Sequence, residues 1–420
     1  MIKKIKEKFA DPLIKGSAVL FVSGIFSNLA AYLYHLVSGR FLIPADYGLL
    51  ESLISLTYFL NVLTGTIGFV FVNFFAVLKE DEVSANLCFL KRKFDKSTVV
   101  FCLLLILFYP VFNKFLRIGN FPIFLIFVLQ NLFGFFALLY GSLLQSRLKF
   151  TALAFLTIAA SFSRVIFPLI FLSFGAEVQG VLVGGTIAAA INFILAKMLA
   201  VKLFRKNEKK IVKQKLNFLN YSLLSFFTNV GLISLYTTDI LFVRYYLTGA
   251  ESGVYSSVSV LGKMIFFGAS MILTVVFPMF IKEKKNIPHL RKIFTASFFF
   301  VVLISLTGTI VFKTFPELIV RTLYGNNYKN AYLYLPQFAV FISLVVVFNL
   351  FIQFLLALAK KSAPVLSLAT AALQIILMVK RHQSVLELIK VSTASVFFGL
   401  TLSLFPIIFS LSKKGERRKI

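Results

Sequence analysis

LYLPQFAVFISLVVVFNLFIQFLLAL (residues 333–358) is a run of 26 residues that contains no Asp, Glu, Lys or Arg. A hydrocarbon core of about 30 Å needs about 20 helical residues, because each residue rises about 1.5 Å and lipid offers no partner to an open backbone group. The run is therefore expected to be a transmembrane helix. It is one of roughly a dozen such runs in a 420-residue chain that is 59% apolar, with a mean hydropathy of +0.90.

The apolar runs divide the chain into two halves of six spans each. We expect spans near residues 16–38, 48–76, 97–116, 121–146, 151–174, 179–202, 217–247, 253–281, 293–312, 333–358, 362–379 and 391–411. These spans use the whole chain and leave no room for a further soluble domain, which usually needs about 50 residues or more. The sequence thus predicts an all-α polytopic membrane protein with two six-helix halves, residues 1–210 and 211–420.

Basic residues predict the orientation of the spans. Segments on the N-terminal side of the predicted membrane hold 30 Lys and Arg, against 9 on the opposite side. Cytoplasmic loops retain positive charge, so both termini are expected in the cytoplasm. The net charge of +28 is then mostly a matter of topology and of contact with anionic membrane lipids, and no nucleic-acid partner is expected.

The two halves look like copies of one unit. FSNLAAYLY (Phe26–Tyr34) is similar to FTNVGLISLY (Phe227–Tyr236), and LLQSRLKFTALAFLTIAASF (Leu143–Phe162) to LLALAKKSAPVLSLATAALQ (Leu355–Gln374), at offsets of 201 and 212 residues. With six spans each, both copies would enter from the same side and be related by an axis along the membrane normal. Such halves favour a central cleft opened by rocking; the alternative is the ordinary similarity of apolar helices.

Three strings carry a family resemblance. They are GRFLIPADYGLLESLISLTYFL (Gly39–Leu60), DILFVRYYLTGAESGVYSSVSVLGKM (Asp239–Met264) and LYGNNYKNAYLYLPQFAV (Leu323–Val340). They resemble segments of the polysaccharide-biosynthesis, or O-antigen type, lipid-linked oligosaccharide flippases of the MOP exporter superfamily, relatives of the MATE transporters. The resemblance implies a MOP/MATE-like multi-pass protein of the cell (inner) membrane, without cofactors, that moves a polyprenyl-diphosphate-linked oligosaccharide from the cytoplasmic to the outer leaflet. It also implies a polysaccharide polymerase or ligase as a partner. Together with the two-half architecture and the cations described below, it favours alternating access through a cationic central cavity.

One stretch departs from the family pattern. The turn between the last two helices, MVKRHQSVLELIK (Met378–Lys390), has basic residues and no glycine, whereas its counterpart FGAEVQGVLVGG (Phe174–Gly185) is Gly-rich. The sequence therefore leaves open whether the last two helices pair normally.

Charged and amide residues inside the spans are the candidate binding groups, because an ionisable group in a membrane is costly and tends to face a cavity or a partner. Arg164 and Lys263 are placed to bind a diphosphate, which a guanidinium grips in a bidentate way; either cation could instead neutralise a carboxylate, chiefly that of Asp239. Amides in four further positions would hydrogen-bond sugar hydroxyls or, equally, join helices: Asn28, Asn229, Gln130 and Asn349.

Asp239 is the acid placed deepest in a predicted span. It is a candidate proton or sodium site, or a structural partner of Lys263 or Arg244. His35, Arg40 and Glu51 lie at the predicted outer ends of the first two helices, where they would form an outer gate or simply occupy the interface. The two cysteines, Cys88 in a predicted cytoplasmic loop and Cys102 in the next span, are interpreted as inert, and neither a metal site nor a catalytic residue is expected.

Two other functional classes stay open. A MATE-like, cation-coupled multidrug antiporter would share the architecture, but its cavity is expected to be acidic rather than cationic. A membrane glycosyltransferase or polymerase is disfavoured, because the longest outer loop, residues 313–332, carries only the acid Glu317. The sequence does not identify the sugar, the glycan pathway, the coupling ion or the oligomeric state.

Overall fold

The computed structural model describes residues 12–201 and 219–412, and all regular structure in these two ranges is helical. Several of the basic clusters used to predict the orientation, and the boundary at residues 210 and 211, lie outside the described residues. The elements are α2 (Pro12–Phe41), α3 (Pro44–Ala76), α4 (Glu80–Leu107), α5 (Tyr109–Leu116), α6 (Phe121–Ser146), α7 (Phe150–Ser173), α8 (Val178–Val201), α9 (Leu219–Tyr246), α10 (Gly249–Glu283), α11 (Ile287–Thr314), α12 (Pro316–Tyr324), the 3₁₀ helix η1 (Asn326–Leu333), α13 (Leu335–Ala357), α14 (Ser362–Lys380) and α15 (Val385–Leu411).

The fold class predicted from the sequence is confirmed. Within the described ranges, eleven helices are long and apolar enough to cross a membrane, or up to twelve when α4 and α5 are counted as one bent span. This pair corrects the predicted third span: α4 begins at Glu80, inside the predicted cytoplasmic loop, and the chain bends by 54° before α5. The bend falls where Pro110, in the first turn of α5, has no backbone N–H to continue a hydrogen-bond ladder. Cys88 accordingly lies on a helix, not in a loop.

Two further predictions change near the C-terminus. The predicted outer loop 313–332 is largely helical, because it forms α12 and most of η1. The last two helices, whose pairing the sequence left open, pack against each other: a Cβ placed on Gly399 of α15 would lie 2.7 Å from Cγ2 of Thr370 on α14. The glycine that permits this approach lies inside α15 and not in the turn that precedes it.

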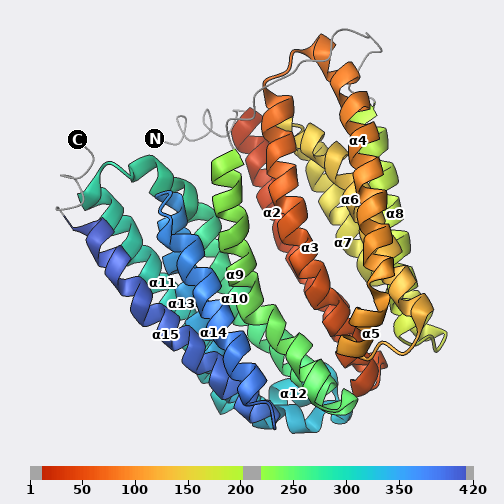
Figure 1. The fold of residues 1–420 in the computed structure, drawn as a ribbon, viewed down its shortest axis with the longest axis vertical. Coiled ribbons are helices and arrows are strands. Elements are labelled where there is room, and N and C mark those ends of the chain that lie inside the picture. The colour runs from red at the N-terminus through yellow and green to blue at the C-terminus, as the bar shows by residue number, and fades with distance from the viewer. Residues whose placement is uncertain (1–11, 202–218, 413–420) are drawn as a thin grey trace. The chain divides into compact units, whose positions relative to one another are not determined.

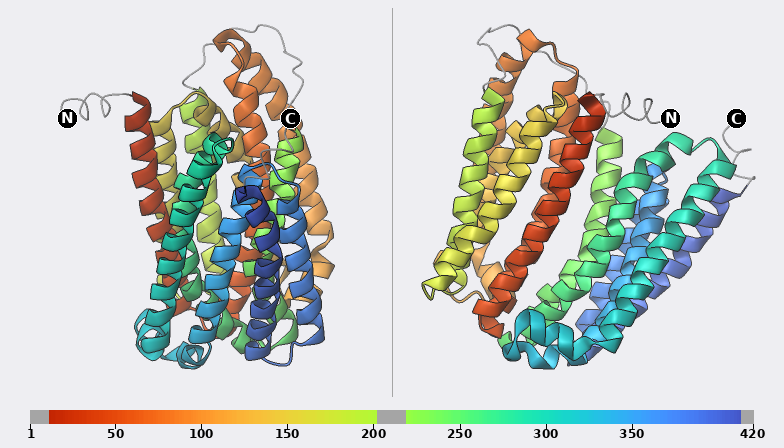
Figure 2. Two further views of the ribbon diagram at one scale, coloured as in Figure 1. Left: turned by 90° about the vertical axis from the view of Figure 1, so that its left-hand side faces the viewer. Right: turned by 180° about the vertical axis from the view of Figure 1, so that it is seen from behind.

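Contacts divide the chain into two units, residues 1–42 with 63–219 and residues 43–62 with 220–420. In the first unit, α6 and α8 pack against each other, as do α2 and α7, and Phe71, Phe75, Leu139 and Leu143 belong to its buried core. In the second unit, α13 is the most buried helix and contacts α10, α11, α14 and α15 (Figure 1 and Figure 2). The two six-helix halves stay a prediction. In the structure, the contacts place the first part of α3 in the second unit.

The first part of α3 is held to α10 by two facing glycines. A Cβ on Gly48 would lie 2.7 Å from the backbone nitrogen of Gly253, and a Cβ on Gly253 would lie 2.6 Å from Cα of Pro44. The phenol oxygens of Tyr47 and Tyr324 are 3.0 Å apart in a buried hydrogen bond. These contacts position the residues of α3 that follow, Glu51 and Tyr58, within the second unit.

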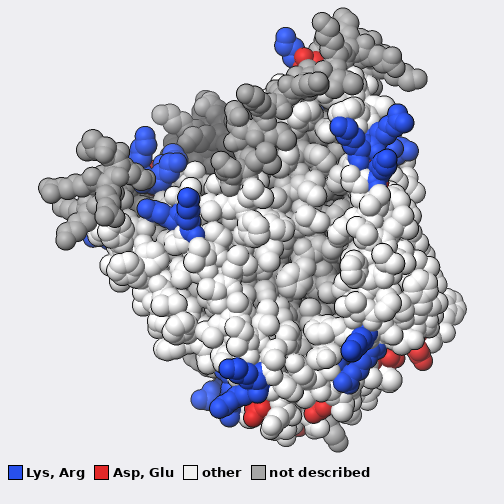
Figure 3. Space-filling model, viewed as in Figure 1, with Lys and Arg blue, Asp and Glu red and all other residues white. Residues whose placement is uncertain are grey.

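Charged side chains are distributed as expected for helices in a membrane. On the face drawn in Figure 3, Lys and Arg gather in separate patches, most of them near helix ends and one along α4, and the broad surface between these patches is uncharged. Large apolar side chains such as Phe299, Ile310 and Phe405 are exposed on the helices. An apolar surface of this kind suits lipid rather than water.

Candidate functional site

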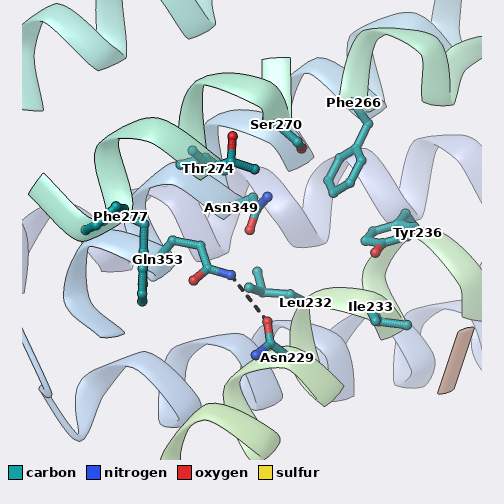
Figure 4. Close-up of a pocket in the computed structure, with 12 residues that line it drawn as sticks. Asn229, Leu232, Ile233, Tyr236, Phe266, Ser270, Thr274, Phe277, Asn349 and Gln353 are labelled. Atoms are coloured by element: carbon teal, nitrogen blue, oxygen red, sulfur yellow. Dashed lines mark hydrogen bonds between the residues drawn. The ribbon is translucent and has the colours of Figure 1, made fainter. Parts of the chain in front are cut away.

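A pocket of about 370 Å³ lies within the second unit (Figure 4). Its walls come from α9, α10 and α13. Its volume falls in the range typical of small-ligand sites, about 300–1,000 Å³. The lining residues are Asn229, Leu232, Ile233, Tyr236, Phe266, Ser270, Leu273, Thr274, Phe277, Pro278, Asn349 and Gln353.

Three carboxamides enter the pocket from two helices. Gln353 of α13 donates from Nε2 to Oδ1 of Asn229 on α9 at 3.3 Å, the bond drawn in Figure 4. The amide nitrogen of Asn229 also donates to the carbonyl of Ser225 at 2.8 Å. Asn349, one turn before Gln353 on α13, points into the space between the helices with only 7% of its surface exposed. The structure therefore brings together two amides named from the sequence, Asn229 and Asn349.

Lys263 is buried next to this pocket, with 4% of its surface exposed. Its ammonium lies 5.8 Å from the ring centre of Tyr58 on α3 and 5.9 Å from that of Tyr236 on α9, within the range of cation–π attraction. Tyr236 also lines the pocket, so the cation and the pocket share one aromatic wall. The carboxylates that act on Lys263 through space are those of Asp239 and Glu51.

Asp239 is fully buried on α9. Its Oδ2 accepts a hydrogen bond from the phenol of Tyr255 on α10 at 2.6 Å, and its Oδ1 accepts one from the backbone N–H of Ile240 at 2.9 Å. Arg244, the other cation considered as its partner, donates to the carbonyl of Ala45 at 3.1 Å. The hydrogen bonds to Asp239 thus come from a tyrosine and its own helix, while Lys263 acts on it electrostatically. A role in ion coupling stays a prediction.

The remaining candidates for substrate contact belong to the first unit. The guanidinium of Arg164 on α7 lies 4.7 Å from the ring centre of Tyr34 on α2, and its Nε is buried without a hydrogen-bond partner among the described residues. Asn28 is exposed on α2. The side-chain oxygen of Gln130 lies 2.8 Å from the position of a Cβ on Gly185, so this amide sits at the contact of α6 with α8. Its position is typical of an amide that joins helices.

The three residues assigned to an outer gate fall in different units. The His35 ring meets Tyr34 edge to face, with ring centres 5.5 Å apart, and Arg40 is exposed at the end of α2. Glu51 belongs to the second unit, where it is 2% exposed. A common gate formed by His35, Arg40 and Glu51 stays a prediction.

Comparisons with known proteins agree with this architecture. The family model of polysaccharide biosynthesis proteins matches residues 13–284. The chain belongs to this family. A solved structure of the lipid II flippase MurJ shares its fold, with a TM-score of 0.72 and 14% identity over 94% of this chain and 89% of that one.

Two MATE structures are also similar to this member of the family. The MATE multidrug transporter DinF-BH has a TM-score of 0.66 and 14% identity over 94% of this chain and 96% of its own. An inward-facing multidrug resistance MATE transporter of the MOP superfamily has a TM-score of 0.64 and 11% identity, covering 90% and 94% respectively. No curated protein matches the chain. At these identities the structural likeness shows the MurJ/MATE-like fold, and the family follows from the family model.

Several pocket residues of this polysaccharide biosynthesis protein were not singled out from the sequence. Phe266, Ser270 and Thr274 recur every four residues on α10, so they share one face of the helix. Lys263 lies three residues earlier on the same face. This spacing was the available signal, but it matches that of any apolar helix face, and only the packing of α9 and α13 against it distinguishes a pocket from a filled core.

Proposed function

We propose that this protein is a flippase that moves a polyprenyl-diphosphate-linked oligosaccharide from the cytoplasmic to the outer leaflet of the cell membrane by alternating access. Membership of the polysaccharide biosynthesis family supports a role in handling lipid-linked sugars, and the fold shared with a lipid II flippase supports transport as the activity. In this proposal both termini are cytoplasmic, the protein is a transporter and not an enzyme, and a polysaccharide polymerase or ligase receives the cargo.

The proposal rests on the surroundings of two cations in membrane-spanning helices, Lys263 and Arg164. Lys263 is held against two tyrosine rings, and the buried Nε of Arg164 has no partner among the described residues. Burying a cation costs free energy that facing anions recover, and at Lys263 the carboxylates of Asp239 and Glu51 act in this way in the absence of substrate. A diphosphate is a further anion of higher charge, and it accepts charge-assisted hydrogen bonds from both kinds of side chain.

The test is flipping of a fluorescent polyprenyl-diphosphate oligosaccharide in proteoliposomes. We expect Lys263→Gln and Arg164→Gln each to lower the initial rate about tenfold or more, because a hydrogen bond to a charged group contributes about 1.5–3 kcal/mol. Lys282→Gln is the matched control, since Lys282 is exposed at the end of the same helix as Lys263. If all three variants flip the lipid like the unaltered protein, the cationic-site proposal is wrong.

A MATE-like, cation-coupled multidrug antiporter is the second candidate. It is favoured by the similarity to MATE structures and by the buried carboxylate of Asp239. This function predicts export of a fluorescent organic cation against a proton or sodium gradient, and its loss in Asp239→Asn. Gradient-driven export of that cation without movement of the lipid-linked sugar would replace the flippase proposal.

A further inference from the structure

We propose that the pocket between α9, α10 and α13 binds an uncharged, hydroxyl- and acetamido-bearing sugar unit next to the diphosphate, and that it selects against acidic sugars at this position. The inference rests on the proposed flippase function, because it places the diphosphate at Lys263. It adds a specificity site in the second unit.

The lining chemistry suits a neutral sugar. None of the twelve lining residues is Asp, Glu, Lys, Arg or His, while three carboxamides and two aliphatic hydroxyls are among them. Carboxamides donate and accept hydrogen bonds, which matches sugar hydroxyls and acetamido groups. A uronic acid in the same place would lose its hydration without meeting a cation in the lining, and an uncompensated buried charge is strongly disfavoured.

Two polar groups of the pocket are placed to meet a ligand. The Ser270 hydroxyl is buried without a hydrogen-bond partner among the described residues. The amide of Asn349 points into the space between the helices, with 7% of the surface of this residue exposed. Buried polar groups in native proteins are normally satisfied, so the Ser270 hydroxyl can take a polar partner inside the pocket, and the amide of Asn349 faces the same space.

The geometry connects the pocket to the cation. The rings of Tyr236 and Phe266 lie 4.5 Å apart at 41° and form an apolar wall for the C–H face of a sugar. The same Tyr236 ring lies 5.9 Å from the ammonium of Lys263. Along α10, Lys263 and Thr274 are separated by about 16 Å at 1.5 Å per residue. A diphosphate at Lys263 thus places the sugar attached to it at the aromatic wall and the amides beyond.

The test compares equilibrium binding of three probes to the full chain in nanodiscs. The probes are polyprenyl diphosphate alone, polyprenyl diphosphate carrying an N-acetylglucosamine disaccharide, and the same lipid with glucuronic acid as its first sugar. We expect the neutral disaccharide to tighten binding at least tenfold over the bare lipid and the acidic sugar to give no gain. Asn349→Leu, nearly isosteric, should abolish the gain and leave the affinity for the bare lipid unchanged.

The matched control is Asn131→Leu. Asn131 is buried to the same degree, with 8% of its surface exposed, but it lies in the first unit and is bonded to the carbonyl of Phe127; this variant should keep the gain. Ser270→Ala removes only a hydroxyl, so it provides a second test if Asn349→Leu does not fold. In this variant the gain in affinity from the neutral disaccharide should fall at least threefold.

Each unexpected result points to a different error. Equal affinity for all three lipids, or a gain that survives both pocket variants, would overturn the sugar site and leave the flippase proposal standing. Binding of none of the three lipids by the folded, unaltered protein would overturn the flippase proposal itself.

Discussion

Replacing Gly253 by alanine should loosen the attachment of α3 to α10. The new Cβ would lie 2.6 Å from Cα of Pro44 and closer still to its carbonyl group, whereas non-bonded carbon atoms normally stay about 3.5–4.0 Å apart. The obstacles are backbone atoms, so no side-chain rotation relieves the overlap and α3 must shift by roughly 1.5 Å to clear the carbonyl oxygen. Overpacking of this kind costs about 1–3 kcal/mol.

Gly268→Ala on the same helix separates this steric effect from helix propensity. Its Cβ would meet nothing closer than Cγ2 of Ile304 at 3.9 Å, so this variant should gain about 0.5–1 kcal/mol from the loss of glycine flexibility. Thermal unfolding in detergent measures both variants. For a unit of roughly 200 residues, 1 kcal/mol corresponds to about 2–4 °C, so Gly253→Ala should unfold several degrees below Gly268→Ala. Equal or reversed midpoints would refute the close-contact argument.

Three further predictions concern single side chains. Tyr255→Phe removes the 2.6 Å bond to Asp239 and should destabilise the protein by about 1.5–3 kcal/mol. Thermal unfolding should show this loss largely absent when Asp239 is already Leu, which has no acceptor for the phenol, and an undiminished loss would contradict the pairing. Ser384→Ala removes the hydroxyl that accepts from the N–H of Glu387 at the start of α15, at a cost of about 1 kcal/mol, whereas Ser362→Ala, at a residue that caps no helix, should leave the unfolding midpoint unchanged. Cys88 is exposed, so an impermeant maleimide should label it in inside-out vesicles but not in intact cells; the opposite pattern would reverse the proposed orientation.

The helices were largely predictable because each must supply its own backbone hydrogen bonds in lipid, which makes a span a local property of the sequence. The predicted fourth span, 121–146, has the same bounds as α6. The predictions of helix bounds were wrong where a helix is polar or too short to cross a membrane. The first half of α4 is helical although it carries the basic residues of the predicted loop, and α12 with η1 is helical although it is too short to span.

The candidate site was only partly predictable. Lys263, Asp239, Asn229 and Asn349 stand out in the sequence because polar groups are costly in a membrane. The residues that surround these groups do not stand out in the sequence. Tyr255 donates to Asp239, and the rings of Tyr58 and Tyr236 lie beside Lys263. In the sequence these three are ordinary aromatic residues of apolar helices, and only packing brings them to their partners.

The sequence by itself determined that this chain crosses the membrane many times and that it belongs among the polysaccharide biosynthesis proteins. These properties follow from composition, periodicity and short local strings, none of which depends on how the helices pack against one another. Only the tertiary structure decided that the first part of α3 joins the second unit through Gly48 and Gly253, and that amides from α9 and α13 face one pocket. The physical reason is that such contacts join residues about 120 to 200 positions apart, and the backbone hydrogen bonds that define each helix do not specify which helix it packs against.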